Sequence, residues 1–192
     1  MMGAQRQPLS DGRWHFQHGP IDIVIGADGE QAALKQAHED AWRRFRTLLG
    51  ELVAELPLLR HPVGEVCLLE GPVAQRMWRA CYPHRRPFIT PMAAVAGAVA
   101  QELVAFYRRP GITRAWVNNG GDIALHLAPD AALTVGLYAD LARLDARELR
   151  DGLTLDGRAR IDYPMVVRGI ATSGWRGRSF SLGIADSVTV FA

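Results

Sequence analysis

The chain has 192 residues and a mass of 21.1 kDa, which is enough for one domain with a well-buried core and too little for two ordinary domains. Hydrophobic residues make up 48% and charged residues 22%, a balance that excludes a disordered or fibrous protein. The net charge is +2, and Lys35 is the only lysine among 22 Lys and Arg residues. Because the arginines are scattered and matched by 20 carboxylates, a nucleic-acid partner is not expected.

The N-terminal segment does not look like a targeting signal. Arg6, Pro8, Asp11 and Arg13 stand where a secretion signal would need an unbroken apolar run. No stretch reaches the roughly 18 apolar residues of a membrane span. The sequence therefore predicts a cytoplasmic protein that does not cross a membrane.

The cysteines and histidines do not have metal-ligand spacing. Cys67 and Cys81 form neither a C-x-x-C pair nor a zinc pattern, and small buried side chains are the simpler interpretation. The six histidines form neither H-x-x-x-H nor H-E-x-x-H. No metal ligand is therefore assigned. A P-loop and a G-x-G-x-x-G motif are also absent.

The N-terminal part of the chain is predicted to contain a hairpin followed by a helix. Residues 13–25 are two β-rich runs separated by Gly19 and Pro20, which is typical of a hairpin. Apolar residues at helical spacing then predict an amphipathic helix over 29–55, which would cover a sheet. Its expected capping pair is Asp28 with Gln31.

Two further helices are predicted, and the second begins with unusually small residues. One covers about 72–82. The other has Thr90 as its N-cap and runs to Tyr107 or Arg108. Its first half leaves so little side-chain bulk that another backbone or a flat ligand could approach; the small residues are Ala93, Ala94, Ala96, Gly97, Ala98 and Ala100.

The rest of the chain is rich in strand-forming residues. Six strands are predicted, over 112–117, 122–127, 133–138, 161–167, 169–172 and 187–191. Early helices and late strands predict an α+β fold in which helices cover one face of a largely antiparallel sheet, all within a single domain over 1–192.

Three clusters of glycine and hydroxyl residues are candidates for ligand binding. Two of them, residues 118–122 and 169–174, lie at the ends of apolar runs, where exposed backbone can meet a phosphate or a flat ring. The third is the small-residue helix start, whose N-terminal N–H groups favour anions. For each cluster the alternative is structural: a hairpin turn, a local hydroxyl turn, or tight helix packing. Ser173 lacks the G-x-S-x-G context of a nucleophile.

Taken together and in order, four segments resemble the ApbE-like superfamily, which includes the FAD:protein FMN transferases. They are Thr90 to Gly97, Asn119 to Ile123, Ala171 to Gly174 and Ser187 to Val190. The likeness is strongest to a short branch of that superfamily, and it covers about residues 88–192.

The resemblance implies an α+β fold that binds FAD. In the transferases FAD is cleaved at its pyrophosphate with the help of Mg²⁺, and FMN passes to a threonine of an acceptor protein. The residues that the resemblance places at the flavin nucleotide are Asn119, Gly120, Gly121, Asp122, Thr172, Ser173 and Gly174, with Thr90, Ala93 and Gly97 at the helix start.

The departures from the transferase pattern concern catalysis and the metal. The helix start has no lysine, and Trp175 to Phe180 stands where the transferases carry a His and an Asp-Pro pair. Their metal-binding segment opens a C-terminal helix beyond the last strand, which this sequence does not contain; either the protein is truncated there or the helix lies beyond Ala192. Mg²⁺ ligands and catalytic residues are therefore not assigned.

Three functions follow as hypotheses. The first is binding of a flavin nucleotide, FAD, with transfer of FMN to a protein as an extension. The second is a non-catalytic ligand-binding module that keeps the fold without the metal site. The third is an assembly protein in which the glycine clusters are merely turns and an oligomer buries the Trp-rich surface.

Overall fold

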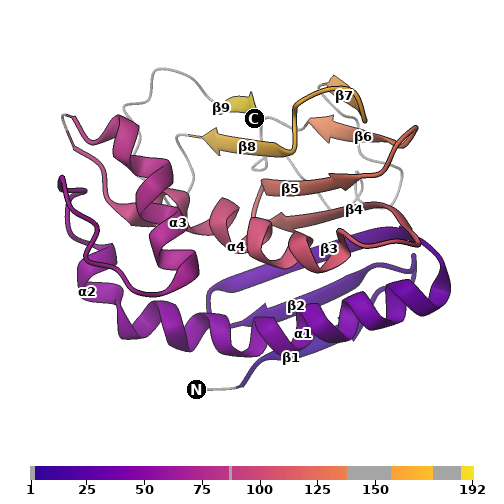
Figure 1. The fold of residues 1–192 in the computed structure, drawn as a ribbon, viewed down its shortest axis with the longest axis horizontal. Helices are drawn as coiled ribbons and strands as arrows, with labels where there is room; N and C mark the ends of the chain where they lie inside the picture. The colour runs from indigo at the N-terminus through magenta and orange to yellow at the C-terminus, as the bar shows by residue number, and fades with distance from the viewer. Residues whose placement is uncertain (1–2, 87, 138–156, 175–186) are drawn as a thin grey trace, which may run out of the picture.

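The computed structural model describes residues 3–86, 88–137, 157–174 and 187–192. A seven-stranded antiparallel sheet lies at the centre, in the order β1-β2-β3-β4-β5-β8-β9, and β6 and β7 form a separate two-stranded sheet (Figure 1). The strands are β1 (Gln5–Pro8), β2 (Trp14–His18), β3 (Ile21–Gly29), β4 (Ile112–Asn119), β5 (Asp122–Leu127), β6 (Ala132–Leu137), β7 (Gly157–Asp162), β8 (Gly169–Gly174) and β9 (Ser187–Phe191).

The helices gather on one face of the central sheet. Helix α1 packs on β2 and β3, α4 packs on β4 and β5, and α3 packs on α4 (Figure 1). Their bounds are α1 (Gln31–Ala54), α2 (Leu56–Leu59), α3 (Pro72–Cys81) and α4 (Val95–Val104), with 3-10 turns η1 (Tyr82–His84), η2 (Pro91–Ala94) and η3 (Ala105–Tyr107). The predicted α+β architecture is thus confirmed. Among the described residues no helix is both long and apolar enough to cross a membrane.

The hairpin and the long helix form as predicted, but the predicted cap is wrong. Gly19 has a φ of 56° in the β2–β3 turn, a conformation that favours glycine. Helix α1 takes Glu30 as its N-cap, without a side-chain hydrogen bond. Asp28 instead belongs to β3, where its carboxylate pairs with Arg114 on the neighbouring strand. Asp28 is therefore a strand residue and does not cap helix α1, contrary to the sequence prediction.

The third helix and most of the late strands are confirmed with adjusted ends. The predicted helix is η2, α4 and η3 in succession, and Thr90 precedes it without making a side-chain cap. Strand β7 ends at Asp162, so the prediction over 161–167 extended the strand too far toward the C-terminus. Strand β1 was not predicted, and it pairs with β2 at the sheet edge. Cys81 is buried and Cys67 half-buried, both as free thiols.

Two apolar cores lie on opposite faces of the sheet. The larger one joins α1, α3 and α4 to the inner face of β2 to β5. The smaller one lies between β5, β8 and the β6–β7 hairpin, and consists of Leu125, Leu127, Leu133, Ile161 and Ile170. Residues alternate between the two faces along β5, so Ala124 joins the larger core and Leu125 the smaller.

Candidate functional site

The glycines of the first cluster form the β4–β5 turn. Asn119 pairs with Asp122, so Gly120 and Gly121 are the two loop residues of the hairpin. Their φ values are 64° and 102°, both in the region that favours glycine. The Gly121 N–H donates to Asn118 Oδ1 at 2.9 Å, which closes the turn. The cluster is therefore a hairpin turn, and Gly120 is exposed at its tip.

Asn119 joins this turn to helix α4. Its side chain is 9% exposed, and its Nδ2 donates to the carbonyl oxygen of Ala96 at 3.1 Å. Because Ala96 lies in the first turn of α4, this hydrogen bond holds the end of β4 against the helix start.

Asp122 is the point where three segments meet. Its half-buried carboxylate lies beside Gly97, in the first turn of α4, and its charge interacts with the backbone N–H groups of Gly97 and of Thr172, in β8. Burial raises the pKa of Asp122, and the interactions with the two N–H groups oppose that rise. The carboxylate thus lies near the start of α4, where the N-cap residue Ala94 has no side-chain acceptor.

Thr172 lies against the glycine turn from the other side. A Cβ atom on Gly121 would stand 3.8 Å from the Thr172 carbonyl oxygen. The Thr172 hydroxyl is 3.1 Å from that of Thr189 on β9. Ser173 and Gly174 continue β8 in register with β9, while the side chain of Ser173 lies outside the described residues.

Thr90 and Ala93 lie in the segment that leads into α4. The Thr90 carbonyl accepts from the Ala93 N–H at 3.1 Å, and the Ala93 side chain is exposed. Further along the helix, Ala98 and Ala100 are buried against β4 and β5. The small-residue surface is therefore largely used for packing, and Gly97 is its member nearest to Asp122.

The structure thus brings together Asn119, Gly121, Asp122, Gly97 and Thr172, which come from three separate parts of the sequence. The arrangement offers exposed backbone at the hairpin tip, a threonine hydroxyl and a half-buried carboxylate. Within the described ranges, no three His, Cys, Asp or Glu side chains come together as a metal site would need. The segment from Trp175 to Phe180, which the sequence analysis compared with the His and Asp-Pro segment of the transferases, lies outside the described residues.

Sequence reasoning did not find the open groove at the opposite end of β4 and β5. This groove is lined by the α1 start, the η3–β4 connection, the end of β5 with the β5–β6 turn, and the residue after β7; its members include Glu30, Arg108, His126 and Tyr163. The sequence feature that could have indicated this groove is the Arg108-Arg109 pair, but such a pair usually lies on the solvated surface.

Comparisons with known proteins assign the chain to a family. The family profile described as "AbpE bacteria" matches residues 6–192. A UPF0280 protein of Methanopyrus kandleri is 35% identical over 173 residues, which cover 89% of this chain and 63% of the relative. UPF0280 proteins of Methanosphaerula palustris and Methanococcoides burtonii are 34% and 39% identical, covering 94% and 93% of this chain and 70% and 69% of the relatives.

The chain therefore spans about two thirds of the length of these relatives. The profile match extends over nearly all of the sequence, and the identities lie above 30% across most of it. The chain belongs to the family described as AbpE bacteria, and the UPF0280 proteins are its relatives.

Proposed function

We propose that this protein is an ApbE-like binder of a flavin nucleotide, FAD, at the end of the sheet where the β4–β5 turn lies. One observation carries the proposal: the Asp122 carboxylate interacts with the α4 start and with β8 beside the glycine turn. These are the segments for which the resemblance implies FAD contact. Segments distant in sequence that converge on one exposed sheet end are a common basis for a ligand site.

The described residues fit a ring or a ribose better than a phosphate held by the helix dipole. Asp122 already places a carboxylate at the start of α4, and its charge opposes a second anion there. Gly120, by contrast, has open space around it, so a flat group can approach its backbone. The Thr172 hydroxyl adds a donor and acceptor at the neighbouring strand. Bound FAD would supply the flavin chemistry, and Asp122 would position the residues around it.

The observation supports binding rather than group transfer. A Mg²⁺ site is not formed by the described residues, so we derive no metal-dependent step. Mg²⁺-dependent release of AMP from FAD, with FMN appearing on an acceptor protein, is the result that would extend the proposal to transfer.

The test is a titration of the protein with FAD, followed by flavin fluorescence, with FMN and ADP as comparison ligands. Gly120→Asn places a side chain over the hairpin tip while keeping a residue that tolerates a positive φ. We expect this variant to fold normally and to bind FAD at least about tenfold more weakly, which corresponds to about 1.4 kcal/mol.

Gly50→Ala is the matched control, because Gly50 lies on α1 with open space around it. It should leave FAD affinity unchanged. Unchanged affinity in Gly120→Asn would show that FAD does not use this turn.

The turn geometry itself supports one alternative, an assembly protein. The positive φ values account for Gly120 and Gly121 without any ligand. Failure of the folded protein to bind FAD, FMN or ADP, together with a stable oligomer, would favour that function over flavin binding.

A further inference from the structure

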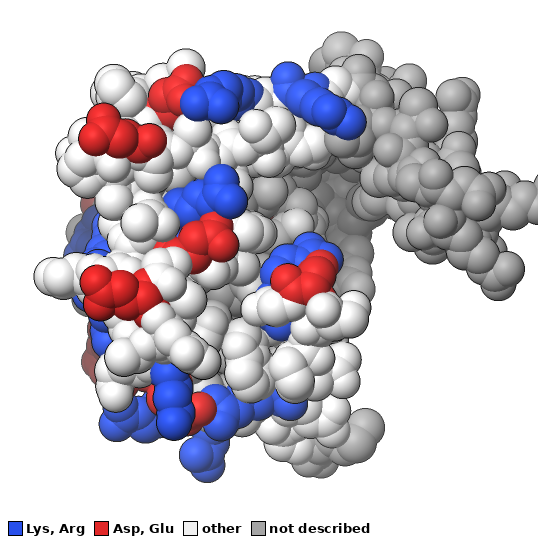
Figure 2. Space-filling model, turned by 90° about the vertical axis from the view of Figure 1, so that its right-hand side faces the viewer, with Lys and Arg blue, Asp and Glu red and all other residues white. Residues whose placement is uncertain are grey.

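A second candidate site lies at the opposite end of β4 and β5. The groove there has a volume of about 790 Å³ and is open to solvent. Figure 2 looks onto this side of the molecule, where acidic and basic side chains are interspersed. The volume of the groove falls in the usual range for small-molecule sites. Asn119 and Asp122 lie at the other end of the same two strands, so the groove is separate from the proposed flavin site.

The wall of the groove is built from tightly joined backbone. The Glu30 N–H donates to the Gly111 carbonyl at 2.7 Å, which joins the start of α1 to the η3–β4 connection. Gly111 has a φ of 84°, and a Cβ atom there would stand 3.1 Å from Glu30 Oε2. The groove is therefore a formed feature of the fold, with its remaining surface mainly apolar, from Pro110, Leu127, Ala128, Pro129 and Tyr163.

Arg168 places a positive charge behind the Tyr163 wall. Its guanidinium donates to the backbone carbonyls of Tyr163, Met165 and Val167 at 2.6 to 2.8 Å. It also lies 5.7 Å from the centroid of the Tyr163 ring. These carbonyls fix the position of the guanidinium without neutralising its charge.

Arg108 adds a second positive charge at the rim. Its neighbour Arg109 is neutralised by Asp40, at 2.9 Å, but the ion pairs between described residues include neither Arg108 nor Arg168. The carboxylate in the lining is Glu30. Of the charged residues that line the groove, Arg109 is neutralised by Asp40, Arg108 and Glu30 have no ion-pair partner among the described residues, and Arg168 adds a positive charge from behind Tyr163.

His126 lines the groove, and burial and nearby positive charges lower its pKa. Its Nε2 lies 3.3 Å from the carbonyl oxygen of Ile112, so a neutral ring donates there and leaves Nδ1 as an acceptor. Burial lowers the pKa of His126, and the charges of Arg108 and Arg168 lower it further. Arg108 and His126 thus line the same groove, and Arg168 contributes its charge from behind the Tyr163 wall.

We propose that this groove binds a small anionic molecule with a flat apolar body, such as an aromatic carboxylate. The apolar lining covers the ring, and Arg108 and Arg168 attract the carboxylate. The proposal is independent of flavin binding, since it uses other residues at another end of the sheet.

The test uses 2-naphthoate as the probe and the uncharged 2-naphthalenemethanol as its isostere, measured by calorimetry on the full chain. We expect naphthoate to bind and the alcohol to bind at least about tenfold more weakly. Arg108→Ala should weaken naphthoate binding about tenfold, because Arg108 is exposed and its loss leaves the fold intact. Arg46→Ala removes the same charge from an exposed position on α1 and should have no effect.

Protonation of His126 supplies a second readout. The groups facing it are Arg108, Arg168, Glu30 and the Ile112 carbonyl, and a bound anion would favour the charged ring. Because the pKa of His126 is lowered, naphthoate affinity should rise as the pH falls below about 6.5 in the wild type, and stay level in His126→Gln. Equal binding of the acid and the alcohol, or equal effects of Arg108→Ala and Arg46→Ala, would overturn the proposal.

Discussion

At the scale of single residues, Asp122 shows how one carboxylate can organise a whole end of the sheet. It interacts with N–H groups of α4 and of β8, and burial nevertheless raises its pKa. The folded state therefore favours the uncharged carboxyl, while both N–H groups favour an acceptor nearby. Asp122→Ala and Asp122→Asn are therefore expected to change the stability by different amounts.

We expect Asp122→Ala to lower the free energy of unfolding by about 1–3 kcal/mol, because it removes the half-buried carboxylate that interacts with the N–H groups of Gly97 and Thr172. Asp122→Asn keeps one acceptor oxygen without the charge, and should lie within about 1 kcal/mol of the wild type. Urea unfolding near neutral pH measures both values.

The same residue predicts a pH dependence. A carboxyl group whose folded pKa is raised contributes stability below its unfolded pKa and loses it as the pH rises through the folded value. Asp122→Asn should thus gain stability relative to the wild type as the pH rises from about 3 to about 6. A difference that does not change with pH would contradict the raised pKa.

Gly26 supplies a second prediction at this scale. A Cβ atom there would overlap the Trp116 indole ring, which lies over β3 from the neighbouring strand. Gly26→Ala should therefore destabilise the protein by at least about 1–3 kcal/mol. Thermal unfolding measures the loss, and Gly50→Ala, which meets open space on α1, should be neutral or slightly stabilising.

At the scale of elements, three helices are joined by one buried acidic group. Glu102 of α4 accepts from Arg44 of α1 at 2.7 Å and from Arg76 of α3 at 2.9 Å. Burial alone would raise the pKa of Glu102, but the two guanidinium groups hold it below its ordinary value. Arg44 also pairs with Glu51 of α1, so it keeps a partner when Glu102 is replaced.

Glu102→Gln should lower the free energy of unfolding by about 1–3 kcal/mol near neutral pH. Because the folded pKa is lowered, this contribution is present above about pH 4.3 and is lost as the pH falls through the folded value. Urea unfolding near pH 7 and near pH 3.5 should show the difference shrink. A constant difference would mean that Glu102 acts through packing rather than charge.

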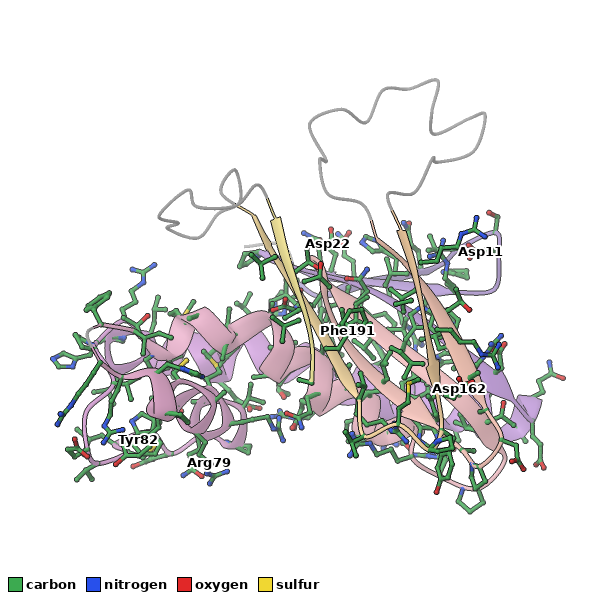
Figure 3. All side chains as sticks on the ribbon, turned by 90° about the horizontal axis from the view of Figure 1, so that it is seen from above. Asp11, Asp22, Arg79, Tyr82, Asp162 and Phe191 are labelled. Carbon is green, nitrogen blue, oxygen red and sulfur yellow. The ribbon has the colours of Figure 1, made fainter. Side chains whose placement is uncertain are left out.

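At the scale of the whole molecule, the two faces of the central sheet are covered by different structures. Helices cover one face, and the β6–β7 hairpin covers part of the other, where Ile161 is 2% exposed (Figure 3 shows this hairpin from above). The smaller core has few members, so each carries a large share of the contact between hairpin and sheet.

Ile161→Ala should cost about 2–5 kcal/mol, because a cavity forms where the side chain met Leu125 and Leu133. Hydrogen exchange should show a larger loss of protection in β6 and β7 than in β2 and β3. Uniform loss across both sheets would show that the two cores unfold as one unit.

The sequence by itself determined the elements and the class of fold. Apolar periodicity predicted α1, helix-start residues such as Pro72 and Thr90 predicted α3 and the α4 segment, and strand-forming residues predicted most strands, because all of these signals are local properties. The same local chemistry identified Gly120 and Gly121 as turn residues. The family resemblance added the set of candidate site residues, and flavin binding stays a prediction.

Tertiary structure alone decided how these parts meet. Asp28 looked like a helix cap and became a strand residue, because its partner Arg114 is distant in sequence. Asp122 is a candidate ligand contact from the sequence, and only folding brings α4 and β8 beside its carboxylate. The groove near Arg108 and His126 likewise has no local pattern, since its wall combines segments that are distant in sequence. Contacts between distant segments depend on the packing of the whole sheet, which local propensity does not encode.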